Sequence, residues 1–434
     1  MANSWRASRW EIAMSNSEIF DPQIALTLLH DLRELTADER GAQRVAWTET
    51  WRKARTWFES KLQDLPVEYH RDAAGNNWIT LKGASEKTLI LGSHLDSVPN
   101  GGWLDGALGV LAGYAILRHF ALSESAPPIT IRLVDWADEE GARFGRSLFG
   151  SSAFAGTHSI AADRYRADRD GITLEEALAE NGIDINRIGD AALERANACA
   201  YLELHIEQGP ILEGLGLPLG AVLGTKGVER HAITFYGQEA HSGSTPMAVR
   251  RDALAAAAKL ALEIRAIAGK HSDAVCTMGS LKTFPGIVTA VVGRAEATLD
   301  QRDLDAGVLA QMYHEAEAAS QRFADEERCT VEWSRIWNIE PVPFHPRLIE
   351  LCEEAIGEIA GPTGKAHRLP SGPLHDAAEV ARLGIPTTMM FVQSLGGISH
   401  NKIEDTRESD LLLAVRAFHA LAEKTIAWIL SKAS

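Results

Sequence analysis

The sequence has few of the features of secreted or membrane proteins. It contains four cysteines in 434 residues, and Cys199, Cys276, Cys329 and Cys352 form no Cys-x-x-Cys pair. This spacing argues against a disulfide framework or a thiolate zinc site, and it predicts buried free thiols. Residues 1–19 alternate charged, polar and aromatic side chains without an apolar run. We therefore expect neither a signal peptide nor a membrane anchor, and a cytoplasmic location.

Basic residues are also in the minority. The chain has 43 lysines and arginines against 59 acidic residues, which gives a formal net charge of −16. This charge would repel the phosphates of a nucleic acid, so we expect no nucleic-acid partner.

The length predicts two domains, and the hydrophobic pattern of the first predicts the α/β class. From residue 88 to residue 212, strand-like runs at 88–91, 129–136 and 201–206 alternate with helical patterns such as 106–122. This rhythm predicts a sheet with helices on both faces. In such folds, ligands bind beyond the carboxyl ends of the strands.

The order of elements changes near residue 218. Strand patterns at 228–236, 274–283, 293–300 and 330–336 and helical patterns at 246–268 and 304–327 follow in the order βαββαβ. This order is typical of a ferredoxin-like α+β domain. Pro341, Pro343 and Pro346 predict a linker, after which a strand at 387–392 and a helix at 407–430 resume the first pattern. We therefore expect one domain from 1–217 and 335–434, with an inserted domain at 218–334.

Histidines and carboxylates follow the strand-like runs of the first domain. His94 and Asp96 end one run, Asp105 follows nine residues after Asp96, and Glu139 and Glu140 close the next run. Nitrogen and oxygen ligands without cysteine are typical of an open site for a hydrolytic divalent metal.

A pair of hydrolytic metal ions needs a bridging carboxylate, further histidine or carboxylate ligands and a free base. His94 and Asp105 are candidates for one ion and Glu140 for the other, and His205 and His400 would complete the set. Glu139 would remain free as the base. Taken singly, each histidine could be an ordinary core or surface residue, and the two glutamates could be a solvated helix start. Their joint occurrence at strand ends favours the metal site.

Four motifs resemble a known family. They are Gly92–Val98 (GSHLDSV), Asp138–Phe144 (DEEGARF), Glu203–Pro210 (ELHIEQGP) and Ala240–Met247 (AHSGSTPM). They resemble the hydantoinase/carbamoylase amidases, a family that includes N-carbamoyl-L-amino acid amidohydrolases, allantoate amidohydrolases and β-ureidopropionases. The family belongs with the dinuclear zinc peptidases and aminoacylases. The resemblance extends over nearly the whole chain after residue 20.

The resemblance implies two divalent ions per subunit. His94, Asp105 and His205 would bind one ion, and Asp105, Glu140 and His400 the other, with Asp105 as the bridge. Zinc is the metal that the family implies, although manganese, cobalt and nickel accept the same donors.

Further roles follow from the same resemblance. Glu139 would be the general base, and Asp96 would orient His94. A histidine at position 205, where related peptidases carry a carboxylate, favours the carbamoylases. The first domain would be zinc-exopeptidase-like, and the inserted domain would act as a lid and as the interface of a homodimer.

The substrate contacts form a second set. The amide of Gln208 can both donate to and accept from a ureido group, although residues 207–210 could also be a simple turn. The resemblance implies that His241 polarises the scissile carbonyl across a dimer and that Arg302 binds the substrate carboxylate. A loop histidine and a surface arginine are the alternatives.

The remaining predicted contacts lie where the chain departs from the family pattern. Thr289 replaces an asparagine, and the loop with Ser371, Gly372 and His375 carries Pro373 and Leu374 between them. These changes lead to the hypothesis of a bulkier or more apolar substrate.

The sequence thus predicts an amidohydrolase that cleaves the linear C–N bond of N-carbamoyl-L-amino acids or related ureido acids. A dipeptidase or aminoacylase with the same metals is the alternative among enzymes. A catalytically silent binding protein is disfavoured, because the expected ligand positions and the base are all filled.

Overall fold

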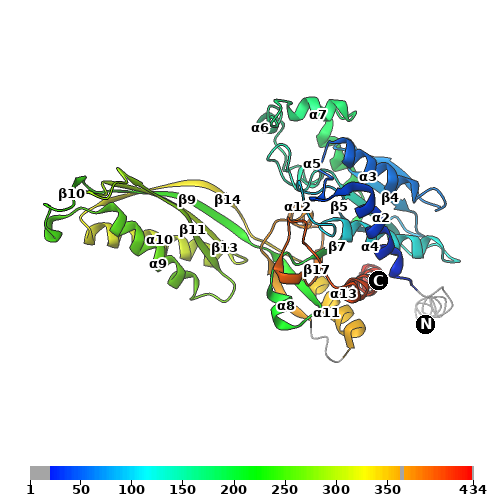
Figure 1. Ribbon diagram of the computed structural model, residues 1–434. Coiled ribbons are helices and arrows are strands. Elements are labelled where there is room, and N and C mark those ends of the chain that lie inside the picture. The colour runs from blue at the N-terminus through cyan, green and yellow to red at the C-terminus, as the bar shows by residue number, and fades with distance from the viewer. Residues whose placement is uncertain (1–19, 362–365, 433–434) are drawn as a thin grey trace. The chain divides into compact units, whose positions relative to one another are not determined.

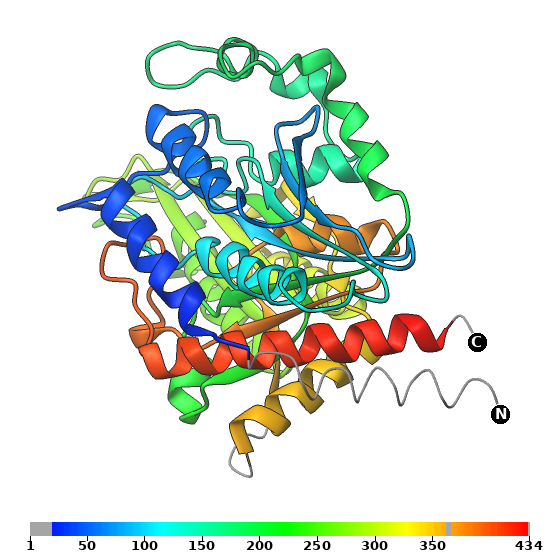
Figure 2. The same ribbon diagram turned by 90° about the vertical axis from the view of Figure 1, so that its right-hand side faces the viewer.

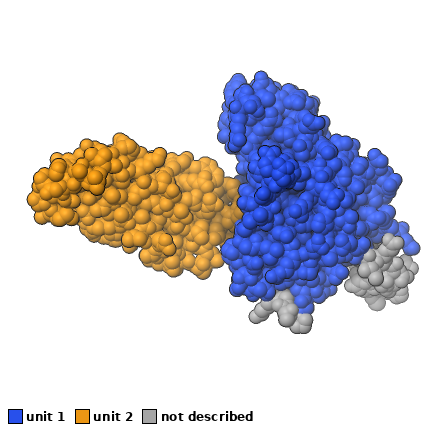
Figure 3. All heavy atoms as spheres, viewed as in Figure 1, with its two compact units in different colours: residues 1–223, 344–369, 375–434 blue, residues 224–343, 370–374 orange. Residues whose placement is uncertain are grey.

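The computed structural model describes residues 20–361 and 366–432. The expectation for residues 1–19 lies outside this range. The chain divides into two compact units (Figures 1 and 3). Unit 1 comprises residues up to 223, 344–369 and from 375 onward, and unit 2 comprises 224–343 and 370–374. In the part of the chain that the structure describes, no helix is long and apolar enough to cross a membrane.

Unit 1 is built on a mixed sheet in the strand order β8-β17-β7-β5-β6-β4-β3. Strands β17, β7, β5 and β6 run parallel, whereas β8, β4 and β3 pair antiparallel. The strands are β3 Glu68–Arg71, β4 Asn77–Leu81, β5 Thr88–His94, β6 Thr130–Trp136, β7 Ala198–Ile206, β8 Leu219–Thr225 and β17 Thr387–Val392. Two short strands, β15 Val342–Pro343 and β16 His367–Ser371, also pair with β8. The predicted α/β class with a mixed sheet is confirmed.

Helices cover this sheet. Helix α4 packs against β5, β6 and β7, and α2 and α13 pack beside it (Figure 2). Helices α5 and α12 pack against each other and against the central strands. The helices of unit 1 are α2 Gln23–Thr36, α3 Glu49–Ser60, α4 Ala107–Ala121, α5 Phe149–Ala155, α6 Ile160–Asp163, α7 Leu174–Glu180, α8 Ile211–Leu215, α11 Pro346–Ala360, α12 Asp376–Arg382 and α13 Glu408–Ser431. The strands β5, β6, β7 and β17 are almost wholly buried, which explains their continuous apolar runs.

Unit 2 follows the order β9, α9, β11, β13, α10, β14. Its strands pair antiparallel in the order β11-β13-β9-β14, and α9 and α10 pack on the sheet. The elements are β9 Gly227–Tyr236, α9 Ala253–Ala268, β11 Val275–Phe284, β13 Arg294–Asp303, α10 Ala306–Glu326 and β14 Thr330–Ile339, with the short pair β10 Ala240–His241 and β12 Ala290–Val291. Alternate residues of β13, including Ala295, Ala297 and Leu299, enter the core, as expected for a strand with one covered face.

The segment expected as a proline linker contains the point where unit 2 ends and unit 1 resumes. Pro343 belongs to β15 there, and Pro346 opens α11, where its missing N–H costs nothing. Two expectations were wrong in detail. The helix expected from Pro246 begins at Ala253, because the Asp252 carboxylate accepts the first free N–H groups and caps the helix there. Two of the thiols, Cys199 and Cys276, are only half-buried.

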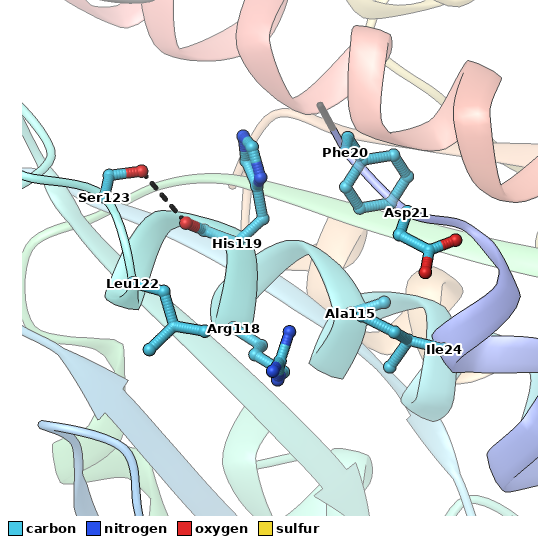
Figure 4. A pocket seen from close by; sticks show the side chains of 8 residues that line it. All are labelled: Phe20, Asp21, Ile24, Ala115, Arg118, His119, Leu122 and Ser123. Carbon is cyan, nitrogen blue, oxygen red and sulfur yellow. Dashed lines mark hydrogen bonds between the residues drawn. The ribbon is translucent and has the colours of Figure 1, made fainter. Parts of the chain in front are cut away.

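A cavity of about 310 Å³ lies between the start of α2 and the end of α4 (Figure 4). Phe20 and His119 line it, and the ring of His419 from α13 stacks on Phe20. No residue of the predicted metal site lines this cavity.

Candidate metal centre

His94 and Asp105 lie together at the end of β5. His94 is the last residue of that strand, and Asp105 stands two residues before α4, with 3.8 Å between His94 Nε2 and Asp105 Oδ1. Gly106 between Asp105 and α4 has a φ of 64°, and a Cβ there would lie 2.3 Å from His94 Cε1. The turn therefore requires glycine, both for its backbone conformation and for the space beside the imidazole.

His205 joins them from β7, the strand next to β5. Its Nε2 lies 3.2 Å from Asp105 Oδ1. The Nδ1 atom lies 2.9 Å from the Ile206 carbonyl oxygen, and Nδ1 of His94 lies 3.1 Å from the Asp96 carbonyl oxygen. A backbone carbonyl thus engages one nitrogen of each ring, which leaves both Nε2 atoms directed at Asp105. His94, Asp105 and His205 form one group of candidate metal ligands.

A second group shares the same aspartate. His400 Nε2 lies 3.3 Å from Asp105 Oδ2 and 3.3 Å from Glu140 Oε2. Oδ1 of Asp105 therefore faces His94 and His205, whereas Oδ2 faces His400. Asp105, Glu140 and His400 form another group of candidate ligands. One carboxylate between two such groups is the arrangement that a bridging ligand requires.

Glu139 lies beside the first group, with its Oε2 3.7 Å from His94 Nε2. Two other carboxylates hold its backbone. The Asp96 carboxylate accepts the N–H groups of Glu139 and Glu140, both at 3.2 Å. Asp138, which has a φ of 57°, accepts the Trp47 indole N–H at 2.7 Å and the Gly141 N–H. These contacts fix the two glutamates on a backbone turn that non-glycine residues rarely adopt.

The titratable groups of the centre have shifted pKa values. Burial raises the pKa of Glu140 to about 8 and that of Glu139 well above its usual value. Burial also opposes ionisation of Asp105, but His205 and His400 outweigh it and lower the pKa of this carboxyl. Hydrogen bonding to Asp105 raises the pKa of His400 to about 9. Among residues 20–361 and 366–432, no lysine or arginine forms an ion pair with these acids.

The donor set fits a divalent cation. His94 Nε2 and Glu140 Oε1 are buried and have no hydrogen-bond partner among the described residues. An unpartnered buried polar atom destabilises a fold by about 1–3 kcal/mol, unless another group or an ion satisfies it. Mixed imidazole and carboxylate donors suit zinc, manganese, cobalt and nickel.

Two predicted substrate-binding residues lie in unit 1, namely Gln208 and His375. Gln208 Nε2 lies 2.8 Å from Asp105 Oδ2, so this amide faces the metal ligands. Its neighbour Glu207 accepts the N–H groups that open α8. The buried His375 ring lies 4.4 Å from that of His205, and burial lowers its pKa well below the usual value. His375 is therefore a neutral neighbour of a candidate ligand.

The other predicted substrate residues lie in unit 2. His241 and Thr289 come close through the β10–β12 pair, since Ser242 N donates to the Thr289 carbonyl oxygen at 2.9 Å. His241 Nδ1 accepts two backbone N–H groups of its own loop. Arg302 donates to Asp300 at 2.8 Å and to the carbonyl oxygen of Gly372 at 3.3 Å. The adjacent Ser371 hydroxyl donates to the Pro373 carbonyl oxygen.

Sequence reasoning missed residues that support the ligands. Trp47, Ser399 and Glu404 contact Asp138 or Asp105, yet none lies in the recognised motifs. A periodic pattern does not identify such residues, because their contacts join loops that are far apart in sequence. A carboxylate four residues after a candidate ligand was the one local signal for Glu404.

Known proteins are similar to this chain over most of its length. The profile of Peptidase family M20/M25/M40 matches residues 90–424. The chain is 35% identical to an N-carbamoyl-L-amino acid amidohydrolase of Geobacillus stearothermophilus, over 87% of this chain and 92% of that protein. It is 31% identical to an allantoate amidohydrolase of Bacillus subtilis (strain 168), over 88% and 92%. A crystal structure of an amidase of the hydantoinase/carbamoylase family from Burkholderia multivorans superposes with a TM-score of 0.83 at 30% identity, over 93% and 97%.

Proposed function

The chain belongs to peptidase family M20/M25/M40, and from this premise we propose that it hydrolyses N-carbamoyl-L-amino acids or related ureido acids with two divalent ions per subunit. The predicted resemblance to the hydantoinase/carbamoylase amidases is confirmed, and the protein is a metal-dependent amidohydrolase. One observation supports the dinuclear site most directly, namely Asp105 with one oxygen toward each ligand group. Zinc is the expected metal.

The ligands and the base have separate tasks in this proposal. His94, His205, Glu140 and His400 would hold the ions together with Asp105. Divalent ions there would polarise the scissile carbonyl and acidify a water molecule. Glu139 takes a proton from the attacking water and returns it to the leaving nitrogen. Burial raises the pKa of the Glu139 carboxyl, so its ionised form binds a proton more strongly than an exposed carboxylate would.

The substrate follows from the family and from the residues beside the ligands. Hydrolysis of an N-carbamoyl group consumes one water and yields the amino acid, carbon dioxide and ammonia. Gln208 lies against Asp105, where its amide can bind a ureido group. Arg302 would bind the substrate carboxylate, and His241 and Thr289 would complete the contacts from unit 2. Unit 2 would also serve as a lid and as the interface of a homodimer.

A substrate panel tests the proposal. The purified protein is assayed for metal content, then incubated with N-carbamoyl-methionine, allantoate, N-acetyl-methionine and a methionine dipeptide, with ammonia and amino acid measured separately. We expect equal amounts of ammonia and methionine from the carbamoyl substrate, and loss of activity after treatment with a chelator. Cleavage of the acetyl or dipeptide substrate alone would identify an aminoacylase or dipeptidase instead. Turnover of allantoate alone would exclude the bulkier pocket suggested by Thr289 and Leu374.

A further inference from the structure

Glu404 is a buried carboxylate outside the ligand groups and the predicted base. Its Oε1 accepts the backbone N–H groups of Leu104 and Asp105, both at 3.1 Å. Its Oε2 accepts the Ser399 hydroxyl at 2.7 Å. The side chain is 2% exposed, so these three contacts use a carboxylate that water scarcely reaches. A buried acid with three well-placed donors is a specific structural feature, because burial without them would be costly.

The contacts of Glu404 connect the loops of two candidate ligands. Glu404 and Asp105 are 299 residues apart in the sequence. Ser399, next to His400, also lies with its hydroxyl 3.1 Å from Asp105 Oδ2. Glu404 thus holds the backbone of the bridging aspartate directly. Through Ser399, it reaches the aspartate side chain and the loop that carries His400.

The surroundings leave Glu404 little freedom. A Cβ on Gly102 would lie 2.0 Å from the Glu404 carboxyl carbon, so only glycine fits against this carboxylate. The neighbouring Asp405 accepts the Trp103 indole N–H at 3.3 Å, which makes a second link between the same loops. The Glu404 N–H donates to the Asn401 carbonyl oxygen. The loop from Ser399 to Asp405 is therefore anchored to the segment that precedes Asp105.

We propose that Glu404 is a positioning residue that fixes Asp105 and His400 relative to each other and so sets the affinity of the metal centre. The inference rests on the proposed metal function but not on the identity of the substrate. Asp105 serves both ligand groups, so a small displacement of its loop changes both at once. Partners of this kind typically contribute 10–100-fold to metal affinity.

The test uses Co²⁺ as a probe, because its visible absorption reports the ligand geometry independently of turnover. Co²⁺ affinity, the visible spectrum, kcat and KM are measured for the whole protein and for Glu404→Ala, Glu404→Gln and Ser399→Ala. Glu408→Ala is the matched control, since this exposed acid at the start of α13 contacts His30 instead. Circular dichroism and thermal unfolding check that each variant is folded.

We expect Glu404→Ala to weaken Co²⁺ binding about 10–100-fold and to change the spectrum. Its kcat should fall more than KM changes. Glu404→Gln should recover most of the affinity, because its amide oxygen accepts the two backbone N–H groups and its NH₂ donates to the Ser399 hydroxyl. Ser399→Ala should have a smaller effect, and Glu408→Ala none.

Wild-type affinity and spectrum in a folded Glu404→Ala protein would overturn the proposal. If Glu404→Ala does not fold, an unchanged spectrum in Ser399→Ala would overturn the coupling to the His400 loop. A wild-type protein that binds Co²⁺ but hydrolyses no ureido acid would refute the substrate, while the Co²⁺ data would still decide the role of Glu404. A wild-type protein that binds no divalent metal would refute both.

Discussion

Two groups of acidic side chains, one in each unit, are balanced in different ways. In unit 1, Asp105 and Glu139 are buried and the Glu140 side chain is 5% exposed, and histidines are the ion-pair partners of these acids among the described residues. In unit 2, Asp300 is paired with Arg302 at 2.8 Å and with Arg230 at 2.7 Å. An external cation would therefore neutralise these three acids of unit 1, whereas arginines of the protein already neutralise Asp300 in unit 2.

The pKa values follow this difference. Burial raises the pKa of Glu140 to about 8. Burial also opposes ionisation of Asp300, but Arg302 and Arg230 outweigh it and lower the pKa of this carboxyl. The arginines thus compensate the negative charge of Asp300 in unit 2, as a metal ion would compensate that of the carboxylates in unit 1. Arg302 already donates to Asp300, so a substrate carboxylate would compete with Asp300 for this guanidinium.

The largest effect is expected from neutralising Glu139, which lies beside the proposed metal ligands but is not one of them. Glu139→Gln should keep the metal content and lower kcat by roughly two to four orders of magnitude, because the amide cannot accept the water proton. Metal analysis and steady-state kinetics of the same preparation measure both quantities. Glu140→Gln is the control, and it should lose metal as well as activity. Full activity in Glu139→Gln would exclude this residue as the base.

The pH dependence of metal uptake gives the next largest effect. Glu140, with a pKa of about 8, and His400, with a pKa of about 9, are both protonated at lower pH in the metal-free protein and must lose their protons to bind an ion. Metal affinity should therefore fall as the pH drops from 8 to 6, by about tenfold per unit for each displaced proton. Zn²⁺ titrations at pH 6, 7, 8 and 9 measure the slope. A flat profile would show that neither Glu140 nor His400 is protonated in the metal-free site.

The smallest effects are expected from substitutions in the ion pair between Arg302 and Asp300 in unit 2. Arg302→Lys loses the planar guanidinium and should raise KM for a carbamoyl amino acid about tenfold, or 1.4 kcal/mol, with little change in kcat. Asp300→Asn frees Arg302 from its partner and should change KM in the opposite direction. Parallel changes in both variants would mean that the pair is structural and that Arg302 does not bind the substrate.

The sequence was most informative where one strand or one local motif determines the position. The apolar runs that correspond to β5, β6 and β7 indicated the sheet, and the position of His94 could be predicted because it is the last residue of β5. The four motifs identified the family correctly. These features are local, so their hydrophobic period and spacing can be read directly.

The sequence was least informative where distant loops meet. The position of Glu404 four residues after His400 is a local signal, but it does not identify the backbone of Asp105 as the partner, because that contact depends on how the completed fold brings two loops together. The left-handed conformations of Asp138, Gln208 and His400 were also not predicted, since they depend on contacts such as the bond between Trp47 and Asp138. The start of α9 was predicted at Pro246, but the capping carboxylate of Asp252 determines where this helix begins.

The split of unit 1 around unit 2 affects how the enzyme matures. On the proposed ligand sets, a nascent chain presents His94, Asp105 and His205 long before His400 leaves the ribosome. At about 5–20 residues per second, this interval is roughly 10–40 s. With these ligand sets, only a nearly finished polypeptide would bind the second cation, so premature termination before residue 400 would leave at most a mononuclear product.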